Sequence, residues 1–487
     1  MVFSSYIFLL VFLPAVLLGF YALRSRGAFG ASVTFLLIAS FVFYAYWSVA
    51  HLVLLLGSIA GNFALGRAAA TLQTKPARRT AAATAIIGNL LLIFIFKYLD
   101  FAGTNLATLT GNDWRLLNIL LPLGISFFTF QQIGYIVDCY TTRKYERGPR
   151  NYALFVLFFP QLIAGPIVHH NHTRPQFAAL TKSPVNLNFI AYGLMIFAMG
   201  LAKKSLIADP IARAIDPIWT SAASGEPISM AMSWIAIIGY TLQIYFDFSG
   251  YCDMAIGLGL MFGIRLPINF NSPYKSKSII EFWRRWHITL SNFLRDYVYI
   301  RFGGNRGGQL FRLRNIFLTM LIGGVWHGAA WTFVIWGAIH AALITANHAL
   351  RTFAPAFDRW NDLPSVVVKR GATLVFVMLA WVFFRADTTG TAMTIITGLF
   401  DGAQTSFSLN AEIAALMFFA SGLALFAPNS LQVTGYTDRL DKPLPNLDAP
   451  SNKIMRPTPL AATATAIMLA AGVAVAWQPA VFIYFNF

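Results

Sequence analysis

The chain has 487 residues, of which 57% are hydrophobic and 11% are charged, whereas about 25% of the residues in a typical soluble domain are charged. This composition excludes an ordinary soluble protein and indicates a chain that lies within a lipid bilayer. The net charge of +17 does not indicate a nucleic-acid partner, because the basic residues are scattered over short loops and helix ends. Such positions are typical of contacts with lipid headgroups.

Apolar runs long enough to cross the hydrocarbon core, about 17 to 25 residues each, follow one another along the chain. They cover residues 6–23, 32–48, 52–69, 83–98, 116–137, 152–168, 189–207, 229–262, 316–346, 366–384, 411–426 and 460–485. The run at 229–262 is long enough to hold two segments. We therefore predict an all-α polytopic membrane protein with about 11 to 13 segments, in a single domain that comprises residues 1–487.

Basic residues follow the first, third and fifth of these runs. They are Arg24 and Arg26, then Lys75, Arg78 and Arg79, and then Arg143, Lys144, Arg147 and Arg150. By the positive-inside rule these loops face the cytoplasm, which places the N-terminus on the outer side. Since no Lys or Arg precedes the first run and no small-residue cleavage site follows it, we expect this run to remain as the first helix.

The stretch at 263–315 is more polar but keeps a helical periodicity, so we expect a cytoplasmic or interfacial lobe there. Spacings of three and four predict one helical face that carries Trp283, Trp286, His287, Leu290, Phe293, Leu294 and Tyr297. Prolines, asparagines and glycines predict breaks in the helix at 267–274 and 302–309. The polar, proline-rich residues 432–459 predict an extramembrane loop before the last helix.

Two histidines are the first candidates for chemistry, because an ionisable side chain costs about 2.5 to 3.5 kcal/mol at the centre of a membrane helix and usually faces a functional cavity. His287 lies in FWRRWHITLS and His327 in LIGGVWHGAAWTFVIWG. We expect Trp326 and Trp331 to shape a cavity wall at His327, and burial to keep this imidazole neutral, as a general base requires. The alternatives are a bond from His327 to a helix carbonyl, and an interfacial His287 without a role.

Charged residues near these histidines have two interpretations. Arg284, Arg285 and Arg295 match the geometry of phosphate or carboxylate groups of a donor, or else contact lipid headgroups. Asp247 and Asp253 are six positions apart, which places them on opposite faces of a regular helix unless the helix breaks at Gly250. For these carboxylates we favour pairing with one of the three arginines over acid–base catalysis.

We expect no metal site. Cys139 and Cys252 lack CxxC or zinc spacing, and we interpret them as buried thiols. His169, His170 and His172 are clustered, but we place them in a loop with no cysteine or carboxylate beside them. Ligand spacing is also missing around the remaining histidines, His51, His340 and His348.

Several stretches together resemble a known family over most of the chain and in the family's order. They are PLGISFFTFQQIGYIVD from Pro122, FPQLIAGPI around Pro160, YFDFSGYCDMAIGLGLMFG from Tyr245, NFNSPYKSKSIIEFWRRWHITLSNFLRDYVYI from Asn269, GGVWHGAAW from Gly323 and WVFFRA from Trp381. These stretches resemble the membrane-bound O-acyltransferase family, and within it the bacterial alginate O-acetyltransferase branch. One departure is local, since His169 and His170 stand where relatives often carry arginine.

The resemblance implies a multi-helix fold that encloses a tunnel in the bacterial inner membrane, with His327 as the essential catalytic residue and His287 as its partner. It implies transfer of an acetyl group from a cytosolic donor, acetyl-CoA, with no bound cofactor. The acetyl group would reach a periplasmic acetyltransferase or esterase-like partner that acetylates an exported polysaccharide such as alginate.

The residues leave several roles open. His287 would orient the acceptor or protonate the leaving thiolate, and Trp283, Trp286 and Asn292 are candidates for stabilising an oxyanion. D-Alanyl transfer to teichoic acid is an alternative on the same fold, and acetylation of peptidoglycan or cellulose differs only in the acceptor. A transporter or flippase with a proton or substrate path through Asp247, Asp253, His287 and His327 is an alternative of another class.

Overall fold

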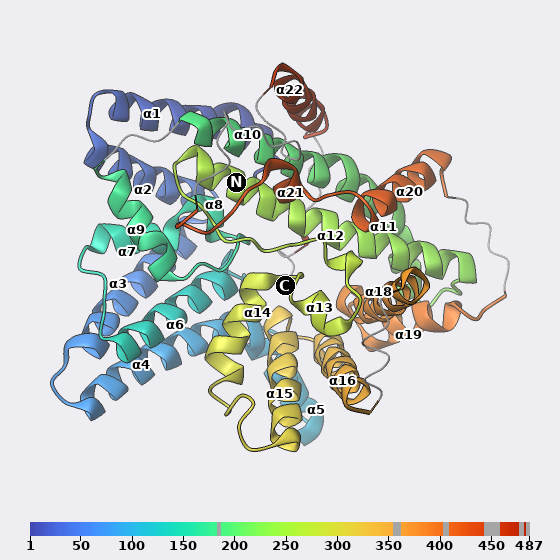
Figure 1. Cartoon of the computed structure of the whole chain (residues 1–487). Helices are drawn as coiled ribbons and strands as arrows, with labels where there is room; N and C mark the ends of the chain where they lie inside the picture. The colour runs from blue at the N-terminus through green and yellow to red at the C-terminus, as the bar shows by residue number, and fades with distance from the viewer. Residues whose placement is uncertain (183–186, 354–361, 403–408, 443–457, 477–481, 484–487) are drawn as a thin grey trace. The chain divides into compact units, whose positions relative to one another are not determined.

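The computed structural model describes the chain except for residues 183–186, 354–361, 403–408, 443–457, 477–481 and 484–487. Every regular element in the described residues is a helix (Figure 1). The predicted all-α polytopic fold is confirmed. The chain forms two compact units, of which the first comprises Met1–Leu201, Tyr251–Pro267 and Thr434–Gln478, and the second Ala202–Gly250, Ile268–Val433 and Pro479–Phe487.

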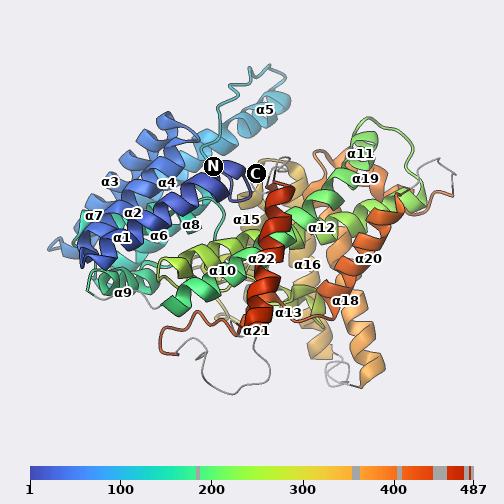
Figure 2. The ribbon, with the colours of Figure 1, turned by 90° about the horizontal axis from the view of Figure 1, so that it is seen from above.

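The helices of the first unit are η1 (Ile7–Phe12), α1 (Leu13–Ser25), α2 (Phe29–Ala45), α3 (Val49–Thr71), α4 (Lys75–Ile93), η2 (Phe94–Tyr98), α5 (Leu99–Thr110), α6 (Ile125–Thr142), α7 (Pro149–Leu157), α8 (Phe159–Leu162), α9 (His170–Leu180), nearly all of α10 (Leu187–Ala202), and α22 (Pro459–Ala474). Within this unit α3, α4 and α6 pack side by side, as Figures 1 and 2 both show.

The helices of the second unit are η3 (Lys203–Ala208), α11 (Asp209–Ala223), the first two-thirds of α12 (Met230–Met261), η4 (Pro273–Lys275), α13 (Ile279–Trp283), α14 (Ile288–Leu294), η5 (Arg295–Tyr299), α15 (Gln309–His327), α16 (Trp331–Phe353), α18 (Leu363–Arg385), α19 (Thr389–Gly398), α20 (Ala411–Leu425) and α21 (Ser430–Thr434). In this unit α15 and α16 lie side by side (Figure 1). A Cβ atom at Gly337 would lie 2.8 Å from the carbonyl oxygen of Met320, so only glycine permits this approach of the two helices.

Six helical stretches of the described chain are long and apolar enough to cross a membrane. They are Ile7–Ser25, Val49–Thr71, Lys75–Thr110, Asn188–Ala223, Trp331–Phe353 and Leu363–Arg385. Shorter apolar helices occur at Phe29–Ala45, Ala411–Leu425 and Pro459–Ala474.

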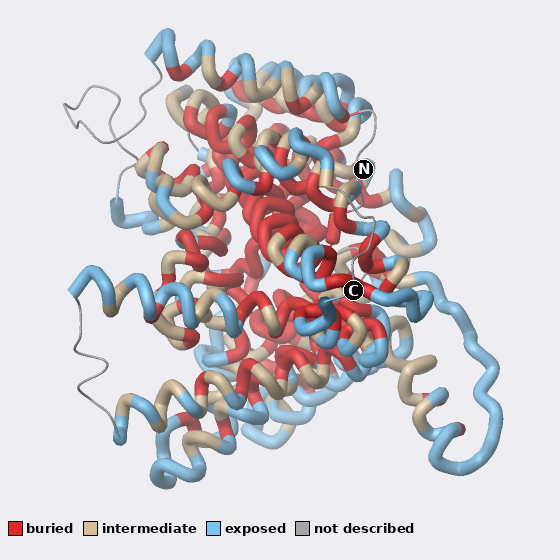
Figure 3. Tube along the Cα trace, turned by 90° about the vertical axis from the view of Figure 1, so that its right-hand side faces the viewer, coloured by how far each residue is buried: buried red, intermediate tan, exposed pale blue. Residues whose placement is uncertain are grey.

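Three of the predicted segments have a different form in the structure. In the run predicted at 116–137 the helix begins only at Ile125, because Gly124 adopts a left-handed φ of 73° two residues after Pro122. The run at 152–168 is not one span, since α7 ends at Leu157 and the short α8 follows. The run at 229–262 is one helix of 32 residues rather than two segments, and no proline interrupts it. Its residues 236–262 are almost all buried (Figure 3, red).

A buried ionic cluster lies where η3, α11 and α12 meet in the second unit. The ammonium Nζ of Lys204 is 2.6 Å from Oδ1 of Asp209 and 2.8 Å from Oδ1 of Asp247, and all three side chains are at most 6% exposed. The second carboxylate oxygen of Asp247 accepts a hydrogen bond of 2.9 Å from the backbone N–H of Ile483. The prediction that Asp247 pairs with an arginine is therefore wrong, because the buried Lys204 is its partner.

The structure also decides between the two geometries predicted for the carboxylates of α12. The helix does not break at Gly250, so Asp247 and Asp253 lie on one continuous helix. Asp247 belongs to the second unit and Asp253 to the first. Both side chains are buried, and that of Asp247 pairs with Lys204 in the ionic cluster.

Candidate active site

His287 lies in a break between α13 and α14, outside the six candidate spans. Its backbone is left-handed, with φ 42° and ψ 53°, a conformation that costs a non-glycine residue about 1 to 3 kcal/mol and is common at functional sites. The prediction of a single helix through Trp283, His287 and Leu290 is therefore wrong. The side chain of His287 is fully buried in the protein.

The side chain of Asn269, in the predicted loop at 267–274, holds His287 in this conformation. Its Oδ1 accepts hydrogen bonds from the backbone N–H of Thr289 at 3.2 Å and from the Thr289 hydroxyl at 2.9 Å. The same oxygen lies 3.2 Å from Nδ1 of His287. Because an oxygen that accepts these bonds is the carbonyl oxygen of the amide, Nδ1 of His287 is the donor, and Nε2 is the acceptor nitrogen of the neutral ring.

Burial lowers the pKa of His287 from the ordinary 6.5 to about 3. Between these pH values the unfolded chain binds a proton that the folded chain excludes, so the contribution of His287 to stability falls as the pH falls from about 7 towards 3. Asparagine tolerates the left-handed backbone. We therefore expect the melting temperature of the His287→Asn variant to fall less than that of the wild-type protein when the pH is lowered. Thermal unfolding in detergent at about pH 7 and about pH 5 measures this difference. An unchanged loss would show that His287 is not the buried neutral base described here.

His327 is the last residue of α15, and its ring is surrounded by aromatic side chains. It is 3% exposed, and its ring centroid lies 4.9 Å from Trp326, 5.1 Å from Trp336 and 5.1 Å from Phe384. The rings of His327 and His287 are 6.4 Å apart. The structure thus brings together the two histidines that the sequence singled out, forty positions apart in the chain.

The aromatic wall at His327 differs in one member from the predicted one. Trp326 takes part, whereas Trp331 is 56% exposed. Trp336, one and a half turns further along α16, takes this place with its ring 88° to that of His327. The break at residues 328–330 between α15 and α16 causes the difference, because spacing counted along one continuous helix does not carry across it.

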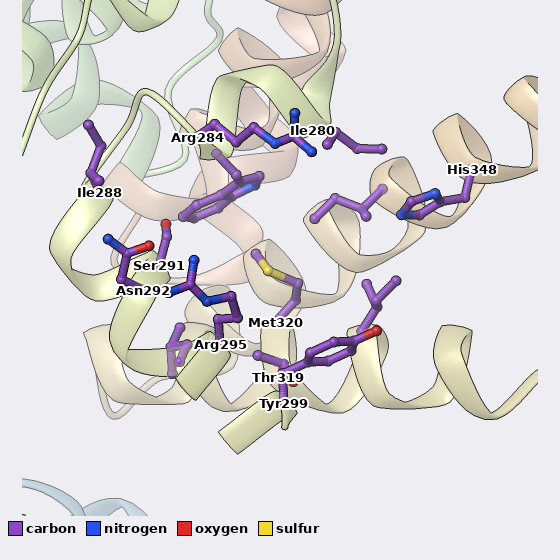
Figure 4. Close-up of a pocket in the computed structure, with 14 residues that line it drawn as sticks. Ile280, Arg284, Ile288, Ser291, Asn292, Arg295, Tyr299, Thr319, Met320 and His348 are labelled. Carbon is purple, nitrogen blue, oxygen red and sulfur yellow. The ribbon is translucent and has the colours of Figure 1, made fainter. Parts of the chain in front are cut away.

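A cavity of about 460 Å³ lies next to this aromatic cluster in the second unit (Figure 4), a size typical of small-molecule sites. Its polar lining comprises Arg284, Ser291, Asn292, Arg295, Tyr299, Thr319 and His348. Figure 4 shows Arg284 on one wall, Asn292 and Arg295 on another, and His348 of α16 opposite them. Neither His287 nor His327 lines the cavity, but Trp283 does.

The predicted supporting residues therefore fall into two groups. Trp283, Arg284, Asn292 and Arg295 line the cavity. Arg285 and Trp286 do not, because Arg285 pairs with Glu281 at 2.7 Å and Trp286 is buried against Phe282 and Phe270.

His340 is a residue of this site that the sequence did not single out. It is fully buried on α16, and its Nδ1 accepts a hydrogen bond of 3.3 Å from the indole N–H of Trp283. Because an indole has a single N–H, this bond removes Trp283 from the candidates for an oxyanion donor. The signal in the sequence is the i, i+4 spacing of Trp336 and His340, which places both on one face of α16.

The clustered histidines of the first unit have a structural environment of their own. His170 begins α9 rather than lying in a loop, and its Nε2 is 3.3 Å from Oε2 of Glu146. The prediction that no carboxylate lies beside this cluster is therefore wrong, since the fold brings Glu146 to it from a distant position. Nε2 of His172 lies 2.9 Å from the backbone carbonyl oxygen of Arg265.

Comparison with known proteins identifies the family of the chain. The profile of the membrane-bound O-acyltransferase family matches residues 148–386, which include both histidines and the cavity. A peptidoglycan O-acetyltransferase of Helicobacter pylori is 42% identical over 428 residues, which are 82% of this chain and 80% of the relative. A probable alginate O-acetylase AlgI of Pseudomonas aeruginosa is 38% identical over 98% of this chain and 91% of its own. A teichoic acid D-alanyltransferase of Bacillus subtilis is 31% identical over 55% of this chain and 67% of its own.

The chain belongs to the membrane-bound O-acyltransferase family. It is a multi-pass membrane enzyme that transfers acyl groups to hydroxyl groups.

Proposed function

We propose that the enzyme transfers an acetyl group from acetyl-CoA, on the cytosolic side of a bacterial inner membrane, for the O-acetylation of an exported or cell-wall polysaccharide. The observation that carries this proposal is the buried pair of His287 and His327, with rings 6.4 Å apart, beside a cavity lined by two arginines. The relatives named for the O-acetylation of peptidoglycan and alginate support acetyl as the acyl group.

In this mechanism His327 is the general base. It accepts the proton of the acceptor hydroxyl while the hydroxyl oxygen attacks the carbonyl carbon of the thioester. The new carbon–oxygen bond of the ester forms, and the carbon–sulfur bond breaks and releases the thiolate. The proton then passes from His327 to the leaving thiolate. Positioned base catalysis of this kind contributes about 100 to 10,000-fold.

We assign to His287 the orientation of the acceptor. Its Nδ1 donates to Asn269, so the neutral ring presents an acceptor nitrogen, Nε2, to a hydroxyl group. A ring in this tautomer has no second N–H with which to protonate a thiolate, which favours orientation over proton donation. Of the predicted oxyanion donors, Asn292 lines the cavity and is the candidate for that role.

Of the two cavity arginines, Arg284 is suited to a phosphate group of the donor, since a guanidinium group binds phosphate in a bidentate manner. Arg295 is already engaged by Asp296, to which its Nε and Nη2 donate hydrogen bonds of 2.7 Å and 3.0 Å. We expect Arg284→Gln to raise the apparent KM for acetyl-CoA by about five- to tenfold, with a smaller effect on kcat. Thiol release from acetyl-CoA by the solubilised enzyme measures both constants.

Arg285→Gln is the matched control, because Arg285 is the adjacent arginine and pairs with Glu281 outside the cavity lining. Equal KM values for the two variants would contradict a donor site at Arg284.

The direct test is base-labile acetate on exported polysaccharide from cells that carry the wild-type protein or a deletion. We expect acetate in the first and none above background in the second. An exported polysaccharide implies a periplasmic acetyltransferase or esterase-like partner that receives the acetyl group, so deletion of such a partner should abolish acetate equally. D-Alanine esters in place of acetate would instead support the activity named for the Bacillus subtilis relative.

A further inference from the structure

The cavity that suits the donor and the histidine that suits the base are separated by aromatic side chains. Trp283 lines the cavity, and its ring lies 5.7 Å from that of Trp336. Trp336 in turn lies 5.1 Å from His327. Trp283 therefore stands at the boundary, with the cavity on one side and the aromatic wall of His327 on the other. A series of ring contacts through Trp283 and Trp336 thus connects the cavity with His327.

His340 fixes the indole of Trp283. An indole N–H donates only, so the bond of 3.3 Å between Trp283 Nε1 and His340 Nδ1 requires Nδ1 to be unprotonated. The proton of the neutral imidazole therefore lies on Nε2, which makes no hydrogen bond to a described residue. Within the described part of the chain, the bond to Trp283 is thus the one hydrogen bond of the buried His340 ring.

The surroundings of His340 leave it little freedom to move. Its ring stacks on Phe282 with 6.2 Å between centroids and an interplanar angle of 4°. Trp336 contacts it edge-on at 4.8 Å. A ring held on two sides gives the half-buried Trp283 an acceptor at a fixed point, and this hydrogen bond then sets the orientation of the indole.

We propose that His340 is a positioning residue for acyl transfer, which holds Trp283 as the wall between the arginine-lined cavity and His327. The inference rests on the proposed function. His340 does not touch the reacting groups in this account, since it acts through Trp283. Loss of the acceptor leaves the indole N–H without this partner at the cavity wall, so we expect the ring to turn and the thioester carbonyl to be displaced from His327. Displacements of about 1 Å can lower the rate of a positioned reaction by up to about a hundredfold.

The test compares His340→Leu, which removes the acceptor, with His340→Asn, whose amide oxygen can replace Nδ1. We expect the leucine variant to deposit base-labile acetate about tenfold more slowly, and the asparagine variant to remain within about threefold of wild type. Trp283→Phe, which removes the donor and keeps an aromatic ring, should match the leucine variant. Trp331→Phe is the control, since Trp331 is exposed on the same helix as His340.

The double variant Trp283→Phe/His340→Leu separates positioning from a general role in packing. If both residues act through one hydrogen bond, the double variant should be no slower than either single variant, because the two losses are not additive. Multiplied losses in the double variant, or equal losses for His340→Asn and His340→Leu, would overturn the inference. Should His340→Leu fail to reach the membrane, Trp283→Phe alone decides, and wild-type acetate in that variant rejects the inference.

The outcomes for the two proposals are distinct. If wild-type cells deposit no more acetate than the deletion strain, the proposed function is wrong, and the inference that rests on it is wrong as well. Wild-type cells with acetate, together with a fully active His340→Leu variant at equal membrane abundance, overturn the inference alone.

Discussion

Replacement of His327 by alanine is expected to lower acyl transfer by about 100 to 10,000-fold, the usual contribution of a positioned general base. The His327→Gln variant should lose as much acyl-transfer activity. Glutamine fills the space between Trp326, Trp336 and Phe384 but is not a base at neutral pH. The measurement is base-labile acetate on exported polysaccharide, normalised to the amount of protein in the membrane.

The control for this result is His51→Ala, which removes a histidine from α3 in the first unit. We expect it to retain acetate. Normal acetate from His327→Ala at matched abundance would exclude His327 as the base, and equal losses from both variants would indicate a general effect of removing a histidine.

Replacement of Lys204 by alanine is expected to give the largest loss of stability. The change leaves the carboxylates of Asp209 and Asp247 buried together without the cation between them. Removal of one partner of a buried ion pair costs about 3 to 5 kcal/mol. We expect a lower melting temperature in detergent and a lower abundance in the membrane. Lys203→Ala is the matched control, because the neighbouring Lys203 donates a hydrogen bond of 3.0 Å to the hydroxyl of Ser430.

A second variant distinguishes charge from packing in this cluster. Lys204→Met combined with Asp209→Asn and Asp247→Asn removes all three charges and keeps similar volumes. Since neutral replacements of buried ion pairs are often tolerated, the triple variant should be more stable than Lys204→Ala. A triple variant that is less stable would show that packing around these side chains, rather than an unbalanced charge, sets the stability.

The sequence predicts the helical fold well where apolar runs are uninterrupted. The runs at 52–69 and 366–384 lie within α3 and α18. The predictions fail where the backbone departs from the helix for reasons that hydropathy does not register. Residues 116–121 are apolar except for Asn118, but they precede Pro122 and the left-handed Gly124 and form no helix.

The pair of histidines could be predicted, but the side chains around it could not. His287 and His327 stand out because charged and ionisable groups are rare in so apolar a chain. Trp336 was not predicted in the aromatic wall at His327, because the helix ends at His327 and spacing along one helix does not carry over to α16. His340 was missed because its partner Trp283 lies fifty-seven positions away, and only the fold brings the two together. For the same reason the partner of Asp247, Lys204, was not found.

The left-handed backbone at His287 also limits which residues evolution or protein engineering can place there. Asparagine, aspartate and histidine itself adopt this conformation several times more readily than other non-glycine residues, whereas valine, isoleucine and threonine resist it because their branched Cβ atoms meet the backbone. An amide or carboxylate at this position would preserve the chain path through Asn269 and still offer an oxygen to a hydroxyl group. A family that varies at this position should therefore draw on a short list of small polar side chains, and a β-branched residue there would signal a rebuilt loop.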